Sequence, residues 1–206
     1  MLLVAALART RHLDSRVYLQ LRKARGNQLY LEQAVPTMEG CRLSSGADVV
    51  LSDPARYAGS GLEPGLYSFE TLQEKYSAQC LDEQLFELYL DANELQNFLS
   101  TRLSASVCAA VNSPDIVIYG ARIDYDPADC IVRKIKICTW YESTSLQCRR
   151  WSVLRDESVR IAATKSIFEK ILEQYPNTSY IATKDVRTSL RRFVDQYDGR
   201  NSTSLR

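Results

Sequence analysis

The chain has 206 residues, of which 45% are hydrophobic and 25% are charged, as in an ordinary globular protein. Its formal net charge of +1 at pH 7 excludes a polycation, and no run of apolar residues is long enough to cross a bilayer. We expect a single α+β domain over residues 1–206, because a chain of this length can bury its own core. The alternative is a sub-boundary in the loop-rich residues 36–68, which would separate a hairpin or arm at 1–35 from a main domain at 69–206.

Charge is unevenly distributed along the chain. Residues 1–35 carry six Lys or Arg and two Asp or Glu, residues 36–115 carry four and twelve, and residues 116–206 carry sixteen and eleven. The three net charges are therefore +4, −8 and +5. Basic ends around an acidic middle indicate either attraction between the folded parts or two surfaces with different partners.

The predicted location is intracellular and cytoplasmic. Residues 1–25 are rich in Arg and contain one acid, Asp14, as mitochondrial presequences are, so a mitochondrial location is the alternative. The six cysteines form no Cys-x-x-Cys pair, and His12 is the only histidine. We therefore expect small buried thiols in a reducing compartment, without a disulfide scaffold or a zinc site.

The first predicted elements are a β-hairpin over residues 16–35 and a loop-rich region after it. Gly26 and Asn27 tolerate positive φ in the turn, and a register that sets Leu21 opposite Leu31 gives one apolar face. Glycine and proline are frequent in residues 36–68, where one short strand is expected over Asp48–Ser52.

Residues 69–103 form the predicted helical middle of the chain. From Leu81 to Leu103, apolar residues recur at steps of three and four, and acids occupy the opposite face. This pattern predicts an acidic amphipathic helix that packs along much of its length.

A three-stranded antiparallel meander is expected next, with strands near 115–119, 131–141 and 148–154. A type I turn over Asp126–Asp129 would pair Ile118 with Ile137 on the core face. The same register would set Arg122 opposite Arg133, two like charges that repel.

Two C-terminal helices complete the prediction. The first begins at Asp156 and ends at Tyr175, because Pro176 disfavours helical geometry in the residue before it. The second begins at Thr183 and stops at Gly199. The predicted fold class is therefore α+β: an N-terminal β-hairpin, an acidic helical middle, and a three-stranded antiparallel meander packed by two C-terminal helices.

The sequence predicts no catalytic residue, no metal ligand and no cofactor. It has no Gly-x-Ser-x-Gly motif, no phosphate-binding glycine loop, and no cysteine with an evident basic partner. A metal-dependent nuclease would need an acid-x-Lys on the strand that pairs with the one opened by Asp115. The strand that begins at Ile131 has no acid at that place.

Nucleic-acid binding is favoured by basic and aromatic residues on the predicted sheet and last helix. Aromatic rings on a sheet can stack on bases while cations contact phosphates. The alternative is that the aromatic residues are core and the helical Arg residues face solvent. The candidate contact residues are Tyr119, Lys134, Lys136, Trp140, Arg149, Arg150, Lys184, Arg187 and Arg191.

We predict from these features a non-enzymatic interaction or assembly protein that acts within an oligomer or larger complex. Its expected partners are other proteins or further copies of itself. An RNA- or ssDNA-binding protein is the first alternative, and a metal-dependent nuclease-like enzyme is the second.

Overall fold

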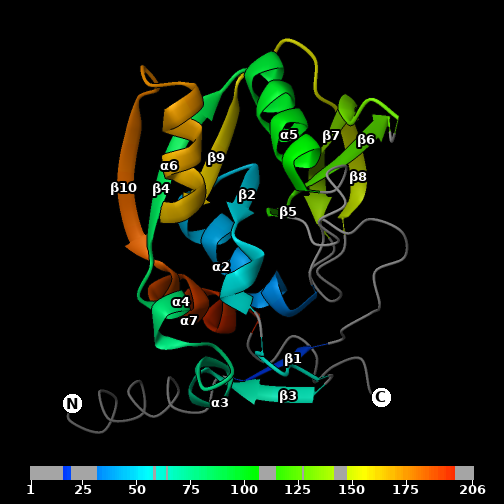
Figure 1. Ribbon diagram of the computed structural model, residues 1–206. Coiled ribbons are helices and arrows are strands. Elements are labelled where there is room, and N and C mark those ends of the chain that lie inside the picture. Colours follow the sequence, from blue (N-terminus) through cyan, green and yellow to red (C-terminus); the bar gives the residue numbers. More distant parts are fainter. Residues whose placement is uncertain are drawn as a thin grey trace, which may run out of the picture.

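The computed structural model describes residues 16–19, 32–57, 59–63, 65–106, 115–126, 128–141 and 148–197. The fold of this part is α+β, with a mixed five-stranded sheet, a three-stranded antiparallel sheet and six α-helices (Figure 1). A further two-stranded pair joins β1 (Arg16–Leu19) to β3 (Gly65–Ser68). No helix among the described residues is both long enough and apolar enough to cross a membrane.

The five-stranded sheet is the centre of the structure. Strands β2 and β9 run parallel, and all other neighbours in this sheet run antiparallel. All four residues of β2 are buried, as expected for a strand covered on both faces. In spatial order the strands are β10 (Tyr180–Asp185), β4 (Gln84–Leu90), β9 (Val159–Thr164), β2 (Val49–Ser52) and β5 (Val117–Tyr119).

Helices cover both faces of this sheet, which gives two hydrophobic cores. Val50 and Leu85 belong to one core, and Leu51 and Leu88 belong to the other, because successive side chains of a strand point to opposite faces. The first core is packed by η1 (Glu32–Ala34), α2 (Val35–Ser45), η2 (Pro54–Tyr57), α3 (Phe69–Gln73), α4 (Ala78–Leu81) and α7 (Val186–Tyr197). The second core is packed by α5 (Ala92–Ser106) and α6 (Lys165–Gln174).

Helices α2 and α7 approach each other at Gly40. A Cβ atom at this position would lie 2.3 Å from the carbonyl oxygen of Ser189, so only glycine allows this backbone contact. Beside it, the buried carboxylate of Glu39 pairs with Arg42 at 2.6 Å and accepts a hydrogen bond from the Tyr197 hydroxyl at 2.7 Å. The buried charge of Glu39 is therefore neutralised within the helix layer.

The three-stranded sheet consists of β6 (Ala121–Asp126), β7 (Ile131–Tyr141) and β8 (Cys148–Val153). Helix α5 covers one face of this sheet: the Gln96 side chain donates to the Val132 carbonyl at 2.7 Å, and the Val132 amide donates to the Ser100 hydroxyl at 3.0 Å. Gly120, with φ of +89°, joins β5 to β6, and a Cβ atom there would lie 2.2 Å from the Asp48 carbonyl oxygen.

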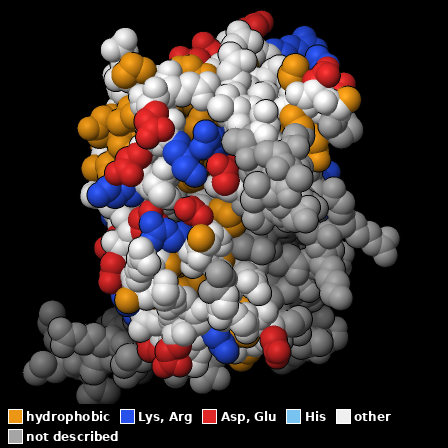
Figure 2. All heavy atoms as spheres, viewed as in Figure 1, with side chains coloured by type: hydrophobic (Ala, Val, Ile, Leu, Met, Phe, Trp, Pro, Cys, Tyr) orange, Lys and Arg blue, Asp and Glu red, His pale blue; other side chains and the backbone are white. Residues whose placement is uncertain are grey.

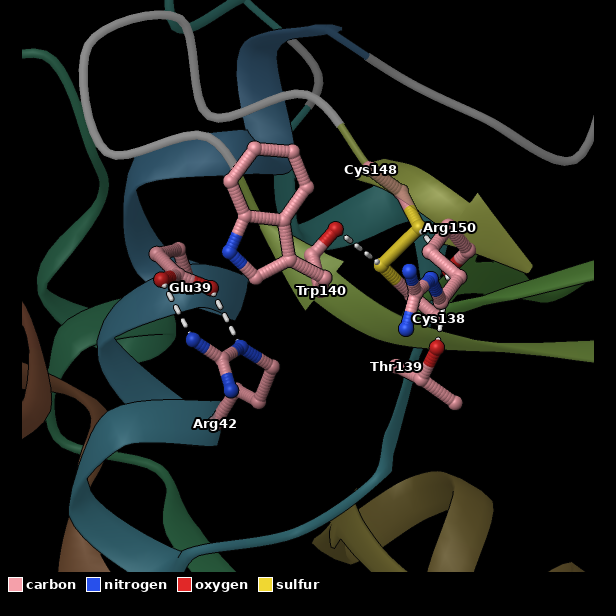
Figure 3. The surroundings of a disulfide bond; sticks show 7 residues. All are labelled: Glu39, Arg42, Cys138, Thr139, Trp140, Cys148 and Arg150. Carbon is pink, nitrogen blue, oxygen red and sulfur yellow. Dashed lines mark hydrogen bonds and ion pairs between the residues drawn. A yellow bond between two sulfur atoms is a disulfide. The ribbon is translucent and has the colours of Figure 1, made fainter. Parts of the chain in front are cut away.

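A disulfide between Cys138 and Cys148 joins β7 to β8, with 5.7 Å between the Cα atoms (Figure 3). Cys130 is also disulfide-bonded, whereas Cys41 and Cys80 are free and buried. The expectation of reduced thiols is therefore wrong for the first three. It depended on spacing along the chain, and the antiparallel pairing of β7 with β8 is what brings Cys138 and Cys148 together.

The predicted N-terminal hairpin is wrong in its described part. Strand β1 pairs with β3, so that Val17 lies opposite Tyr67, and Val35 begins helix α2. The proposed turn lies outside the described residues. In residues 36–68 the strand β2 confirms the short strand that was predicted, but α2 was missed because Pro36 reads as a loop residue. Proline is tolerated in the first helical turn, where its missing N–H has no intrahelical partner.

The predicted helical middle is interrupted by the strand β4. Its apolar residues fit both a helical and a strand pattern over so short a run, and burial on both faces of the sheet decides in favour of a strand. Helix α5 confirms the second part of the prediction. The Asp91 and Glu94 side chains each accept a hydrogen bond from the other's backbone amide, at 2.8 and 2.9 Å, and so fix its start.

The predicted meander is correct for β7, β8 and their antiparallel pairing, but wrong for its first strand and its register: β6, and not residues 115–119, pairs with β7. Ile118 lies in β5 and pairs with Leu51 of the larger sheet, because Gly120 turns the chain away from β7. Arg122 lies opposite Lys136, and Arg133 pairs with acids of the β6–β7 turn.

The C-terminal helices are shorter than predicted, because each is preceded by a strand. Strand β9 replaces the start of the first helix, and β10 precedes the second. Helix α6 ends before Tyr175, as predicted from Pro176. Gly199 lies outside the described residues.

Candidate functional site

Several chain segments meet where the strands β2 and β9 of the five-stranded sheet end and β4 begins. We call this border of the sheet, which runs across the strand ends, the edge of the sheet. Because β2 and β9 are parallel, their last residues, Ser52 and Thr164, lie at the same edge. Strand β4 runs opposite to β9, with Leu85 paired to Thr164, so the preceding Glu83 lies at this edge too. Ligands of open α/β sheets bind outside the carboxyl ends of such strands.

Helix α6 begins at this edge. Thr164 is its N-cap residue in extended geometry, but its side chain makes no capping hydrogen bond. The ten-residue helix has no acid in its first turn, so the partial positive charge of its N-terminus is not balanced by its own residues. Such a helix start attracts negatively charged groups.

A buried ion pair occupies the same place. Arg56, in η2, approaches the carboxylate of Glu83 with 3.2 Å between Nη2 and Oε1. The Arg56 side chain is 20% exposed, but that of Glu83 is only 4% exposed. We call Ser52, Arg56, Glu83, Thr164 and Ser166 the edge cluster.

Three polar atoms of the edge cluster have no hydrogen-bond partner in the part of the chain that the structure describes. Within the described residues, no hydrogen bond reaches Oε2 of Glu83, the Thr164 hydroxyl or the Ser166 hydroxyl, although all three atoms are buried. Burying a polar group without a partner costs about 1–3 kcal/mol. Unsatisfied groups gathered at a helix start therefore indicate a place arranged for something other than stability alone.

Burial raises the pKa of the Glu83 carboxyl above its usual value of 4.5. The charge of Arg56 and the backbone amides of Ser166 and Lys165 act in the opposite direction, and the negative charge of Asp53 adds to the rise. The carboxylate therefore carries its charge at a cost that Arg56 and the start of α6 only partly offset.

The segment 52–57, which contains η2 and Arg56, is held by its own hydrogen bonds. The Tyr57 hydroxyl donates to Ser52 Oγ at 2.8 Å, and the Ala55 amide donates to Asp53 Oδ1 at 2.9 Å. On the other side of the cluster, the Val186 amide donates to the Glu83 carbonyl at 3.0 Å. These bonds fix Arg56 and Glu83 on structured segments of the chain.

The two free thiols near the cluster are poor nucleophiles. Burial raises the pKa of Cys80 to about 12, and the nearby charge of Glu83 adds to that effect. Burial also raises the pKa of Cys41 well above its usual range. Since the thiolate is the reactive form, both residues act as apolar core. The described residues contain no group of three or more His, Cys, Asp or Glu placed to hold a metal ion.

The residues predicted from the sequence to contact nucleic acid are divided among distant parts of the structure. Tyr119 is only 3% exposed, lies in β5, and stacks on Tyr141 with 5.8 Å between ring centroids. It is core and does not share a face with the lysines of β7. The expected common face of Tyr119, Lys134 and Lys136 is therefore absent.

The three-stranded sheet does bring together five of the predicted residues. Among them, Lys136 pairs with Asp124 at 2.9 Å, and Trp140 is 55% exposed. Strand β7 carries three of the five and β8 carries two; they are Lys134, Lys136, Trp140, Arg149 and Arg150.

The remaining three lie on the opposite side of the molecule (Figure 1). Lys184 is in the edge strand β10. Arg187 pairs with Asp82 at 2.8 Å, and Arg191 lies 3.6 Å from the ring centroid of Phe69. These two arginines hold α7 against its neighbours.

Sequence reasoning missed the whole edge cluster. Its members come from three separate parts of the chain, and Glu83 precedes β4 while Thr164 ends β9, two strands that were not predicted. One signal was present: Asp53 and Pro54 directly follow a strand that was predicted correctly and that ends at Ser52. Polar residues directly after a buried strand mark an edge where sites form.

No known family model matches the chain, and no curated protein matches its sequence. Solved structures do share its fold. A 5'-nucleotidase precursor from Thermus thermophilus superposes with a TM-score of 0.62 at 12% identity, over 95% of this chain and 39% of that one. The NAD nucleotidase NadN from Haemophilus influenzae gives 0.57 at 9% identity, over 94% and 37%. The sulfate thiohydrolase SoxB from Thermus thermophilus gives 0.51 at 17% identity, over 93% and 34%.

This likeness corrects the function predicted from the sequence. At such low identities it shows the fold, and the chain spans less than two fifths of the length of the hydrolases named above. The prediction of a non-enzymatic assembly protein, with RNA or ssDNA binding and a nuclease as alternatives, is wrong, because nearly the whole chain has a fold found within nucleotidases and a thiohydrolase. Periodicity and charge could not reveal this, since the fold depends on which strands pair.

Proposed function

We propose that this chain is a domain of a nucleotidase-like hydrolase and that its edge cluster binds the charged phosphate part of the substrate. The observation that carries the proposal is the meeting of Arg56 and Glu83 with the N-terminus of α6 at the carboxyl ends of two parallel strands. The fold likeness to nucleotidases supports the same substrate class.

The chemistry of the edge cluster suits an oxyanion. The guanidinium of Arg56 can donate two parallel hydrogen bonds to a phosphate, and backbone amides at a helix start point toward such a group. The hydroxyls of Thr164 and Ser166 are buried donors without a partner among the described residues. Together these groups could take up the oxygen atoms of one phosphate.

Binding, rather than bond cleavage, is the role we assign to the edge cluster. The nucleotidases named above are more than twice as long as the part that resembles this chain, so their cleaving groups need not lie in that part. We propose that substrate hydrolysis requires groups beyond the edge cluster.

The disulfide between Cys138 and Cys148 favours an oxidising compartment over the cytoplasmic location expected from the sequence.

Self-association or a protein partner stays a prediction. Its most suitable surface is the edge strand β10, where Tyr180 is 51% and Ile181 68% exposed, and where Figure 2 shows hydrophobic side chains gathered. Light scattering of the purified chain tests it.

The proposed function is tested by calorimetric titration of the 206-residue chain with adenosine 5'-monophosphate and with inorganic phosphate. We expect both to bind the wild type and Arg56→Gln to weaken both by at least about tenfold, the equivalent of one lost charge-assisted hydrogen bond. Arg150→Gln is the matched control, because it removes an exposed arginine of the three-stranded sheet. Equal affinities for wild type and Arg56→Gln would overturn the assignment of the site.

A further inference from the structure

Glu83 occupies the place at which the edge cluster would receive an oxyanion. Its carboxylate takes the hydrogen bond of Arg56, and it faces the first amides of α6. Those are the groups that the proposed function assigns to the phosphate. A carboxylate is itself a planar oxyanion, so Glu83 stands in for the ligand in the structure as it is.

The position is an unfavourable one for a permanent structural carboxylate. Only one of its two oxygen atoms has a hydrogen-bond partner among the described residues, although only 4% of the side chain is exposed. A buried ion pair kept for stability alone would satisfy both oxygen atoms. Because one oxygen atom of Glu83 makes no hydrogen bond within the described residues, an incoming anion can displace its carboxylate from Arg56 more easily.

Charged groups surround Glu83 on several elements. Arg56 of η2 attracts its charge, and Asp53, at the end of β2, repels it. The free thiols Cys80 of α4 and Cys41 of α2 lie close enough to sense the same charge. On the side of α6 it faces the amides of Lys165 and Ser166. Arg56 is therefore the principal cation that an incoming anion would take from Glu83.

We propose that Glu83 is a built-in occupant of the oxyanion site, and that a phosphate or sulfate group binds only when Glu83 releases Arg56. The proposal rests on the proposed function, because it assumes that the edge cluster binds oxyanions. It adds a regulatory contact: the empty site is closed by the chain's own carboxylate, and ligand affinity is reduced by the free energy of that contact.

Protonation of Glu83 should open the site. Neutral Glu83 no longer competes for Arg56, so an anion binds the protonated form more tightly, and its affinity rises as the pH falls toward the raised pKa of Glu83. The rise is at most about tenfold for each pH unit, because one proton is coupled to binding. Sulfate is the suitable probe, since its own charge is constant between about pH 5 and 8.

The test is a sulfate titration of wild type, Glu83→Ala, Glu83→Gln and the double variant Arg56→Gln/Glu83→Ala at about pH 7.5 and about pH 5.5. Glu83→Ala should bind sulfate at least about tenfold more tightly than wild type at the higher pH, because Arg56 and the helix start are then uncompensated. The double variant should lose this gain. Only the wild type should gain affinity at the lower pH.

Each outcome decides the question. Sulfate binding that is equal in wild type, Glu83→Ala and Glu83→Gln but lost on Arg56→Gln would overturn the occupant role and leave the proposed function standing. Absence of sulfate, phosphate and nucleotide binding in every variant would overturn both. If Glu83→Ala melts below the temperature of the titration, Glu83→Gln keeps the side-chain volume and removes the charge, so a gain must then appear in that variant.

Discussion

The two larger sheets of the molecule differ in how far their charged side chains are exposed to solvent. In the five-stranded sheet the strands β9 and β2 are covered on both faces, and the charged side chains of Glu83 and Arg56 lie where these strands end, with little access to solvent. In the three-stranded sheet one face packs on α5, and the other carries exposed residues such as Arg122 and Lys134. Both sheets contain ion pairs, but in the pair of Glu83 and Arg56 the carboxylate is buried and its Oε2 atom makes no hydrogen bond within the described residues.

The difference shows that the density of basic residues is a poor guide to a site. The three-stranded sheet is the more basic one, yet Lys136 is paired with Asp124, and Arg133 with Asp126 and Asp129, within reach of water. Exposed pairs of this kind contribute little free energy. The edge cluster has fewer charges, but burial lowers the effective dielectric constant around them and so strengthens each electrostatic interaction.

The largest expected difference between the regions is in packing. Phe98 of α5 is fully buried in the core between the five-stranded sheet and α5. We expect Phe98→Ala to lower the free energy of unfolding by about 3–5 kcal/mol, through lost burial and the cavity left behind. Trp140→Ala is the matched control: Trp140 is 55% exposed, so the loss should stay below about 1 kcal/mol. Urea unfolding measures both, and comparable losses would show that the open face is covered in solution.

The second prediction concerns the stability of the edge cluster. Arg56→Gln leaves a buried carboxylate without its cation, which we expect to cost about 3 kcal/mol in the free energy of unfolding. The pKa of Glu83 should then rise further, since Arg56 is the largest of the effects that oppose its burial.

The stability that Arg56→Gln loses relative to wild type, its deficit in the free energy of unfolding, should therefore depend on pH. An acid whose pKa is higher in the folded than in the unfolded state binds its proton more tightly when folded, so its contribution to stability grows as the pH falls toward the unfolded value of 4.5. The deficit of Arg56→Gln relative to wild type should therefore shrink between about pH 7 and pH 5 in urea unfolding. A deficit that grows as the pH falls would contradict a buried, charged Glu83.

The third prediction concerns the disulfide of the three-stranded sheet. Cys138 and Cys148 are separated by 10 positions, so replacing both by serine should lower the free energy of unfolding by about 2–3 kcal/mol through the regained freedom of the unfolded chain. Urea unfolding of the oxidised wild type and the double serine variant measures the loss. The bond lies away from the edge cluster, so phosphate affinity should not change, and a serine variant that no longer binds phosphate would show that the two sheets are coupled.

Local signals in the sequence were sufficient for several elements. Pro176 correctly ended α6, the apolar run after Asp48 was correctly a strand, and β7 and β8 paired as neighbours. In each case the signal is a property of a short segment: the steric effect of a proline on the residue before it, β-branched residues, or a turn. Such properties are encoded near the residue they affect.

Pairing between distant segments could not be predicted in the same way. Ile118 has the same apolar character whether it pairs with Ile137 or, as it does, with Leu51. The edge cluster depends on this non-local pairing, because Glu83 and Thr164 meet only if β4 lies beside β9. Unless the pairing of the strands is known, Glu83 looks like one more acidic residue on the polar face of a helix.

The smallest expected effect separates the two kinds of ion pair directly. Lys136 and Asp124 are 34% and 56% exposed and lie 2.9 Å apart, a shorter distance than that between Arg56 and Glu83. Distance alone would make the first pair the stronger, but solvent screens it, so Lys136→Gln should cost only about 0.5 kcal/mol. At about 1 M salt that loss should vanish, while the loss for Arg56→Gln should largely persist, because a buried pair is screened far less. Unfolding of both variants at low and high salt makes the comparison, and equal salt sensitivity would mean that water reaches Glu83 as freely as it reaches Asp124.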